Sequence, residues 1–326
     1  MKIQSSLVFD KCSGDLIGFI DFGDPMVNFA YVEEETFASH ALAFLVRGLC
    51  TDLKHIIPYF FTKDLTSFQL MPLFWRAVSI LELSLQLYVC AAVNDGASAN
   101  RKFFRLHSQL AQDLKCDVVY KTRNVFAMSR FIYFFAYLPH LIKTARNCLY
   151  NSGSGSCSRY MWNNGQFLLF RHIADLFYSD QEFALNTLPK LTMDHIVLTP
   201  YSKMKVKLAM QVLSKSVMIS LHGKEDVQET ASWKNNIATR PGTFSADERG
   251  KMFLSPQTYE RFKISVYSHV EAIQFLLEKG FQYVLTERFM QDVLEDYFGH
   301  QRNKGARSDN PTAQQFGYND LTIASQ

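Results

Sequence analysis

The chain has 326 residues, 48% of them hydrophobic and 20% charged, which is enough for a folded protein of about two domains. The formal net charge is +3 at pH 7, so the chain lacks the strong overall positive field that would by itself indicate a nucleic-acid-binding protein. The longest apolar run, residues 131–138, falls short of the roughly 20 residues that a spanning helix needs. Composition thus excludes a disordered chain and predicts no membrane partner.

Cysteine spacing and the first residues indicate an intracellular protein. The six cysteines include no Cys-x-x-Cys pair and no matching histidine spacing, so we expect reduced thiols rather than a zinc site or a disulfide framework. Residues 1–6 lead directly into strand-like sequence, without the apolar segment of a secretory signal.

The chain begins with strand patterns. Residues 7–10 and 16–21 are apolar runs joined by turn residues, which predicts a β-hairpin. Two further strands are predicted at 41–47 and 56–61, and Pro58 favours a sheet-edge position for the second. Residues 66–87 then show apolar side chains at helical spacing, with Ser67 as the expected cap.

Asp95 follows the uninterrupted apolar run 88–93, which predicts a strand buried on both faces. Strands, a crossover helix and a buried strand predict a mixed α/β sheet, and such sheets gather ligands beyond the carboxyl ends of their strands. An acid held there before Gly96 suits a metal ion. The alternative interpretation is an ordinary Asp-Gly turn.

The pattern becomes mostly helical after residue 100. Helical spacing covers 101–114, 138–149, 166–177 and 203–221, which predicts an inserted helical domain. Residues 222–251 lack periodicity and predict a long loop. A helix at 256–278, a short strand at 281–285, a helix at 287–298 and a mobile tail after Gly299 complete the expected order.

Asp292 and Glu295 lie three residues apart and therefore share one side of the predicted last helix. Taken alone, they indicate an amphipathic helix with a solvated acidic edge. Together with Asp95 they suggest a metal site, because phosphoryl transfer by divalent ions needs carboxylates that converge from distant parts of a chain.

Cationic residues form several weak candidate phosphate sites. Lys143, Arg146 and Asn147 give one helix a polar face, for which a solvated surface is the commoner outcome. The segment 201–207 and the tail residues Arg302, Lys304 and Arg307 are local basic clusters. Isolated histidines such as His107 and His195 are expected to be structural. The sequence contains neither a Gly-x-x-x-x-Gly-Lys-Ser/Thr nor a Gly-x-Gly-x-x-Gly phosphate loop.

Four collinear blocks, residues 95–104, 139–143, 198–204 and 291–299, resemble P element-type transposases and their THAP-domain relatives. The resemblance implies an α/β fold, in which an RNase H-like mixed sheet is interrupted by a mostly α-helical insertion domain. The implied boundaries are 1–125 for the first part of the RNase H-like domain, 126–280 for the helical GTP-binding insertion, and 281–326 for the C-terminal helix and tail.

The same resemblance implies cut-and-paste DNA transposition in the nucleus, with Mg²⁺ at a carboxylate triad and GTP as an assembly cofactor. Asp95 matches the second acid of the triad and Glu295 the third, so both are the expected catalytic and metal-binding residues. Lys143 matches a nucleotide-contacting lysine, and Asp292 an acid near the guanine. Transposon ends, target DNA and further copies of the chain are the implied partners.

The chain departs from the family pattern in several places. The first catalytic aspartate of the family precedes the segment matched by Met1, and Asp10 and Asp21 are poor substitutes for it. Tyr137 stands where the family usually has an acid, residues 225–240 look shorter, and the THAP domain and coiled coil are missing. Three interpretations stay open: a transposase core that is truncated and catalytically impaired, a domesticated non-catalytic nuclear module that binds DNA or protein, and a decaying genomic remnant.

Overall fold

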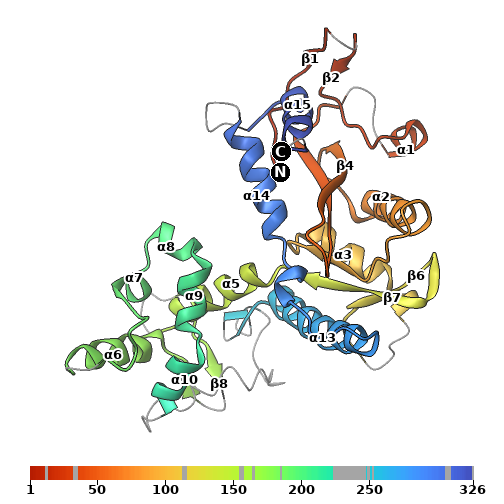
Figure 1. Cartoon of the computed structure of the whole chain (residues 1–326). Helices are drawn as coiled ribbons and strands as arrows, with labels where there is room; N and C mark the ends of the chain where they lie inside the picture. Colours follow the sequence, from red (N-terminus) through yellow and green to blue (C-terminus); the bar gives the residue numbers. More distant parts are fainter. Residues whose placement is uncertain are drawn as a thin grey trace. The chain divides into compact units, whose positions relative to one another are not determined.

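The computed structural model describes residues 1–11, 14–31, 36–111, 116–153, 158–163, 166–183, 186–222, 247, 250–251, 253–304 and 310–324. The chain forms two compact units (Figure 1). The first comprises Met1–Ala136 and Ile264–Gln326, and the second is Tyr137–Lys263. The expected domain boundaries at 125/126 and 280/281 stay predictions. No helix in these described ranges is both long and apolar enough to cross a bilayer.

The first unit begins with short antiparallel strands. β1 (Val8–Phe9) pairs with β2 (Leu16–Ile17), as the hairpin prediction requires, and α1 (Pro25–Tyr31) follows. β3 (His40–Arg47) pairs antiparallel with β4 (Lys54–Thr62), with a register shift between Ala43 and Leu45. Both predicted strands are confirmed, and β4, which contains Pro58, has β3 as its only strand partner in the described part.

The predicted amphipathic helix is α2 (Ser67–Ser79), extended by the π-helical turn η1 (Ile80–Ser84). Its cap is Thr66, whose side chain accepts a hydrogen bond from the Gln69 amide, whereas Ser67, the expected cap, is the first helical residue and is buried. The predicted apolar face is buried and comprises Leu70, Leu73, Phe74, Ala77, Val78 and Leu81.

A second, mixed sheet has the order β5-β7-β6. β5 (Ala91–Asn94) runs parallel to β7 (Ala127–Ala136), and β6 (Lys121–Asn124) runs antiparallel to it. The expected burial of the strand before Asp95 is wrong: all four residues of β5 are half-buried and Tyr88 is 78% exposed. The reason is position, because β5 is the edge strand of this sheet, whereas the central β7 is fully buried from Ile132 to Ala136.

Two short helices, α3 (Ser98–Leu106) and α4 (Ser108–Ala111), replace the single helix expected at 101–114. His107 separates them, donates through Nδ1 to the Phe103 carbonyl at 2.9 Å, and packs its ring on Phe103 and Phe134. It is a core residue, as predicted.

The second unit is mostly helical, as expected. α5 (Leu138–Tyr150) and α6 (Phe170–Gln181) flank the small strands β8 (Trp162–Asn163) and β9 (Gln166–Phe167). The expected helix at 203–221 is divided among three helices that follow α7 (Met193–Ile196): α8 (Pro200–Met204), α9 (Val206–Val212) and α10 (Lys215–His222). The predicted loop at 222–251 lies almost entirely outside the described residues.

The chain returns to the first unit within α13 (Pro256–Glu278), which has the predicted bounds. The strand expected at 281–285 is wrong: no described strand pairs with this segment, and Phe281 and Val284 instead pack against the buried cluster that includes Phe135 and Phe289. The 3-10 helix η3 (Thr286–Phe289) and α14 (Asp292–Asn303) come next. The expected mobile tail is also wrong, because α14 passes Gly299 and α15 (Ala313–Ala324) packs on β4 through the fully buried Phe316.

Candidate functional site

Asp95 occupies the corner between β5 and α3. Its Oδ1 accepts hydrogen bonds from the Ala97 amide at 2.9 Å and from Asn100 Nδ2 at 2.8 Å. Gly96 turns the chain with φ of 73°, a conformation that favours glycine, and Arg101 donates to its carbonyl at 2.8 Å. The chain turns at this corner, as the alternative interpretation predicts. The Asp95 side chain is also exposed, beyond the carboxyl end of β5.

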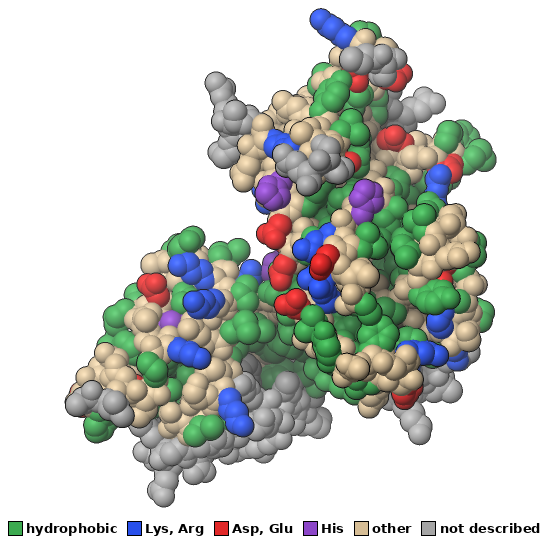
Figure 2. All heavy atoms as spheres, in the orientation of Figure 1, with side chains coloured by type: hydrophobic (Ala, Val, Ile, Leu, Met, Phe, Trp, Pro, Cys, Tyr) green, Lys and Arg blue, Asp and Glu red, His purple; other side chains and the backbone are tan. Residues whose placement is uncertain are grey.

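Glu295 reaches the same region from the far end of the sequence. It is exposed in the first turn of α14, where a negative charge is favoured by the helix dipole. Asp95 and Glu295 both lie close enough to the Met1 amino group to raise its pKa, although burial of that group lowers the pKa by more. Acidic side chains are visible beside the lower end of α14 in Figure 2. Both acids, 200 positions apart in the sequence, therefore lie near the Met1 amino group.

The two aspartates of the N-terminal segment, Asp10 and Asp21, have partners of their own. Asp21 accepts hydrogen bonds from the Gly23 amide and from Asn28 of α1, and Asp10 accepts one from the Tyr318 hydroxyl. Within the described ranges, no three Asp, Glu, His or Cys side chains are close enough to hold a metal ion together. Mg²⁺ nevertheless binds in many sites through one or two carboxylates, with water and phosphate oxygens as the other ligands. The pair of Asp95 and Glu295 fits such a site.

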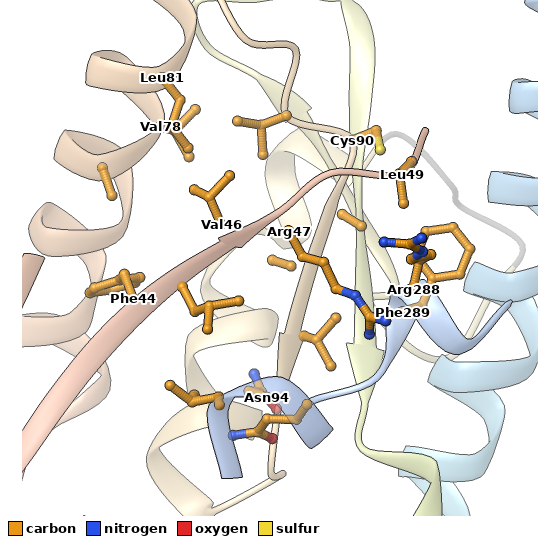
Figure 3. Close-up of a pocket in the computed structure, with 18 of the residues that line it drawn as sticks. Phe44, Val46, Arg47, Leu49, Val78, Leu81, Cys90, Asn94, Arg288 and Phe289 are labelled. Atoms are coloured by element: carbon orange, nitrogen blue, oxygen red, sulfur yellow. The ribbon is translucent and has the colours of Figure 1, made fainter. Parts of the chain in front are cut away.

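A large apolar cavity of about 940 Å³ lies in the first unit next to this corner (Figure 3). Its wall includes Val46 of β3, Val78 of α2, Cys90 before β5 and Phe289 of η3, and it reaches Asn94 and Asp95 at one end. Burial raises the pKa of the Cys90 thiol to about 11, so this cysteine stays a protonated thiol at neutral pH. Sequence reasoning missed the cavity because strand order, which no local pattern encodes, creates it.

The two residues expected to contact a nucleotide belong to different units. Lys143 is half-buried on α5 in the second unit, and Asp292 is exposed at the start of α14 in the first. Both assignments stay predictions. Tyr137, where the family pattern has an acid, precedes α5 and packs its ring edge-on against His140, with centroids 4.9 Å apart.

Arg146 corrects the expectation of a cationic phosphate-binding face on α5. Its side chain is fully buried, and Nη2 donates to the carbonyls of Ser202 at 3.2 Å and Lys203 at 3.0 Å, while Nε donates to Asn147. These carbonyls lie in the last turn of α8, where backbone partners are scarce, although the Ser202 carbonyl also accepts from the Lys205 amide at 3.2 Å. Arg146 therefore stabilises the C-terminal end of α8. Lys143 is the remaining cationic candidate for a phosphate contact on α5.

The remaining polar candidates are surface or structural groups. Lys203 and Lys205 lie over the rings of Tyr150 and Tyr201, and Lys207 is exposed. His195 is buried, completes the cap of α7 with Thr192 and contacts Gln211 through Nε2 at 3.0 Å, so it is structural as predicted.

Comparisons with known proteins agree with this architecture. The model of the family described as TNP-like, RNase H N-terminal domain matches residues 1–108, and that of the TNP-like, GTP-binding insertion domain matches residues 139–240. The chain is 25% identical to the transposable element P transposase of Drosophila melanogaster over 228 residues, which are 57% of this chain but only 29% of that protein. It thus spans less than a third of that relative's length.

A solved structure, the Drosophila P element transposase strand transfer complex, superposes with a TM-score of 0.72 over 99% of this chain and 74% of that one, at 19% identity. The mixed sheet with an acid beyond a strand end, interrupted by a helical unit, defines an RNase H-like fold with a GTP-binding insertion domain. The chain belongs to the P element-type transposase family.

Proposed function

We propose that this chain is a transposase-derived core that acts on DNA with a divalent metal ion held by Asp95 and Glu295. The observation that supports the proposal is that these two exposed carboxylates, from the end of β5 and the first turn of α14, both lie near the Met1 amino group. Mg²⁺ bound there would activate an attacking oxygen or stabilise the leaving oxygen of a phosphodiester.

The surrounding residues would orient the metal-binding acids. Asn100 Nδ2 and the Ala97 amide hold one oxygen of Asp95, so its carboxylate is fixed before a metal binds. Gly96 allows the turn that places Asp95 beyond the strand, and Arg101 stabilises that turn through the Gly96 carbonyl. Glu295 depends on the position of α14, which Tyr297 ties to α15 by donating to Asp320 at 2.7 Å.

For the second unit we propose GTP binding, with Lys143 as a phosphate contact. Lys143 lies near the start of α5 and is half-buried as a residue, and its ammonium can serve as a point charge for phosphate. Asp292, the acid that the family resemblance places near the guanine, lies in the first unit, so the proposal for the second unit rests on Lys143. Nuclear localisation, self-association and binding to transposon ends and target DNA complete the proposal, with Lys205 and Lys207 as candidate contacts to DNA phosphates.

Cleavage by this chain alone is expected to be weak. Within the part that the structure describes, no three Asp, Glu, His or Cys side chains lie close enough together to hold a metal ion, so the proposed site has two acids instead of the three of the family pattern. The same observation favours a second candidate function, a domesticated nuclear module that binds DNA or protein without cutting it.

The experiment is a strand-cleavage and strand-transfer assay on duplex DNA ends, with Mg²⁺, with and without GTP. The transposase-derived core predicts DNA binding with slow Mg²⁺-dependent cleavage that Asp95→Asn and Glu295→Gln abolish. Asp296→Asn removes an exposed neighbouring acid on α14 and is the matched control. Saturable DNA binding supports the binding module if the wild-type chain cleaves DNA no faster than the two variants do. Rapid cleavage contradicts the impairment, and cleavage that survives both substitutions contradicts the site.

A further inference from the structure

The outward face of α13 is apolar where this helix belongs to the first unit. The exposed fractions of Val266, Val270 and Leu277 are 57%, 51% and 45%, and Ile273 between them is half-buried. Successive residues of an α-helix are turned by about 100°, so these four side chains follow one line along the helix. They are called the α13 stripe below. A surface helix ordinarily carries polar side chains on the side away from its core.

The opposite face of α13, toward the sheet, is partly polar. Ser265 Oγ donates to the Ala136 carbonyl at 3.0 Å, and Ser268 Oγ donates to the Tyr120 carbonyl at 2.9 Å. Both serines are buried, and α13 and β7 lie side by side in Figure 1. Hydroxyl groups thus face the core while valine side chains face outward, which is the reverse of the usual surface helix. Packing inside the first unit therefore does not account for the apolar stripe.

The α13 stripe has the spacing of a coiled-coil seam. Its residues are separated by intervals of 4, 3 and 4 positions, the alternation of the two apolar positions in a heptad repeat. In such a seam each side chain inserts between four side chains of a facing helix, so the pattern specifies a helical partner. None of the four side chains is cationic, whereas a DNA backbone is bound mainly by lysine and arginine. A helix therefore fits the stripe better than DNA does.

Charges at the two ends of the stripe indicate that the facing helix is α13 of a second copy. Lys263 precedes Val266 by three positions, and Glu278 directly follows Leu277, so both charges lie toward the same side of the stripe. In an antiparallel pair, Lys263 of each copy lies beside Glu278 of the other. In a parallel pair, lysine would face lysine and glutamate would face glutamate. Charge complementarity thus favours the antiparallel pair.

We propose that the α13 stripe is a self-association surface through which two copies of the chain form an antiparallel helix pair. Val266 of one copy faces Leu277 of the other, and Val270 faces Ile273, so every layer combines a valine with a larger side chain. The antiparallel arrangement also places opposite ends of the helix dipoles together. This inference rests on the self-association included in the proposed function and names its surface. It does not depend on the proposed metal ion or on GTP.

The test measures the mass of the full chain by sedimentation equilibrium at concentrations from about 1 to 100 μM, without DNA, GTP or metal ions. We expect a reversible equilibrium between monomer and dimer. Val270→Glu places two carboxylates in the pair, and we expect a dimer dissociation constant at least about thirtyfold higher. Leu321→Glu changes an exposed apolar side chain of α15 and should leave the constant unchanged. Circular dichroism checks that both variants keep their helices.

Charge reversal examines the direction of the pair and uses positions at its ends. Lys263→Glu makes both contacts with Glu278 repulsive, so we expect the dimer to be about three- to tenfold weaker at low salt. Adding Glu278→Lys to that variant should restore the wild-type affinity. A parallel pair predicts no loss in Lys263→Glu, because like charges face each other before and after the change. An unchanged affinity of Lys263→Glu therefore contradicts the antiparallel arrangement.

The failure of this inference is distinguishable from that of the proposed self-association. If Val270→Glu dimerises as strongly as the wild type, the chain self-associates through another surface and the assignment of the α13 stripe is overturned. If the wild-type chain stays monomeric at about 100 μM, both the self-association and its surface are overturned. DNA cleavage is measured separately and decides neither question.

Discussion

Glu82 shows how single residues position the sheet behind the candidate site. Its carboxylate accepts hydrogen bonds from Arg130, from Asn124 Nδ2 at 2.7 Å and from the Val89 amide at 2.8 Å, and only 4% of its side chain is exposed. Burial acts to raise the pKa of Glu82, but the hydrogen bonds and the charge of Arg130 outweigh it, so the pKa lies below its usual value. This residue connects η1 to β6 and β7.

Glu82→Gln is therefore expected to lower the free energy of unfolding at pH 7 by about 2–3 kcal/mol, because Arg130 loses its charged partner. The pKa of Glu82 is lower in the folded chain than in the unfolded chain, where it is about 4.3. Glu82 therefore stabilises the fold above that unfolded pKa, and this stabilisation is lost as the pH falls through the folded pKa. Urea unfolding measured from pH 7 to pH 3 should thus show that the free energy of unfolding falls less in Glu82→Gln than in the wild type. Asp52→Asn, in an exposed pair with Arg288, is the control, and an equal acid dependence of Glu82→Gln and wild type would refute the account.

At the scale of elements, α15 is part of the core of the first unit. The ring of Phe316 is fully buried against Tyr59, Phe61 and Tyr297, and Gln301 of α14 donates to the Phe316 carbonyl at 3.3 Å. Phe316→Ala should lower the free energy of unfolding by about 3–5 kcal/mol, as expected for a large ring removed from a packed site. Leu321→Ala on the exposed side of α15 should change it little. Chemical denaturation measures both, and equal effects would mean that α15 does not pack as described.

At the scale of the whole molecule, the two units have separate hydrophobic cores. One cluster, which includes Leu149, Leu168 and Ile173, lies wholly within the second unit, and the other clusters lie within the first. Calorimetry should therefore resolve two unfolding transitions, one for each unit. GTP should raise the melting temperature of the second unit only. A concentration of one hundred times the dissociation constant stabilises the bound unit by about 2.7 kcal/mol.

Lys143→Met should abolish most of this shift, whereas Lys190→Met, which removes an exposed lysine of the same unit, should leave it intact. If GTP raises neither transition of the wild-type chain, the proposal of GTP binding by the second unit is wrong.

Much of the fold follows from local pattern. The buried face of α2, the bounds of α13 and the strands β3 and β4 are set by side-chain periodicity, which a sequence displays directly. Residues 281–285 have strand-like composition, yet Phe281 and Val284 pack against Phe289 instead of entering a ladder. The half-exposed β5 and the buried Phe316 depend on which elements become neighbours, and no local pattern specifies that.

The candidate site was predictable only in part. The Asp95 corner follows from a strand that is followed by Asp-Gly, but its pairing with Glu295 is predicted from family resemblance, because nothing in the spacing of the two acids relates them. Arg146 looked like a surface cation on an amphipathic helix and is buried, since its partners are carbonyls 56 and 57 positions away. Backbone carbonyls leave no signature in a sequence.

Binding of one divalent cation by Asp95 and Glu295 can be measured by titrating the chain with Mn²⁺, an oxygen-site probe for Mg²⁺, and following free Mn²⁺ by electron paramagnetic resonance. We expect one saturable site, at least about tenfold weaker in Asp95→Asn and in Glu295→Gln but unchanged in Asp296→Asn. Equal Mn²⁺ affinity in the wild type, Asp95→Asn and Glu295→Gln would contradict it.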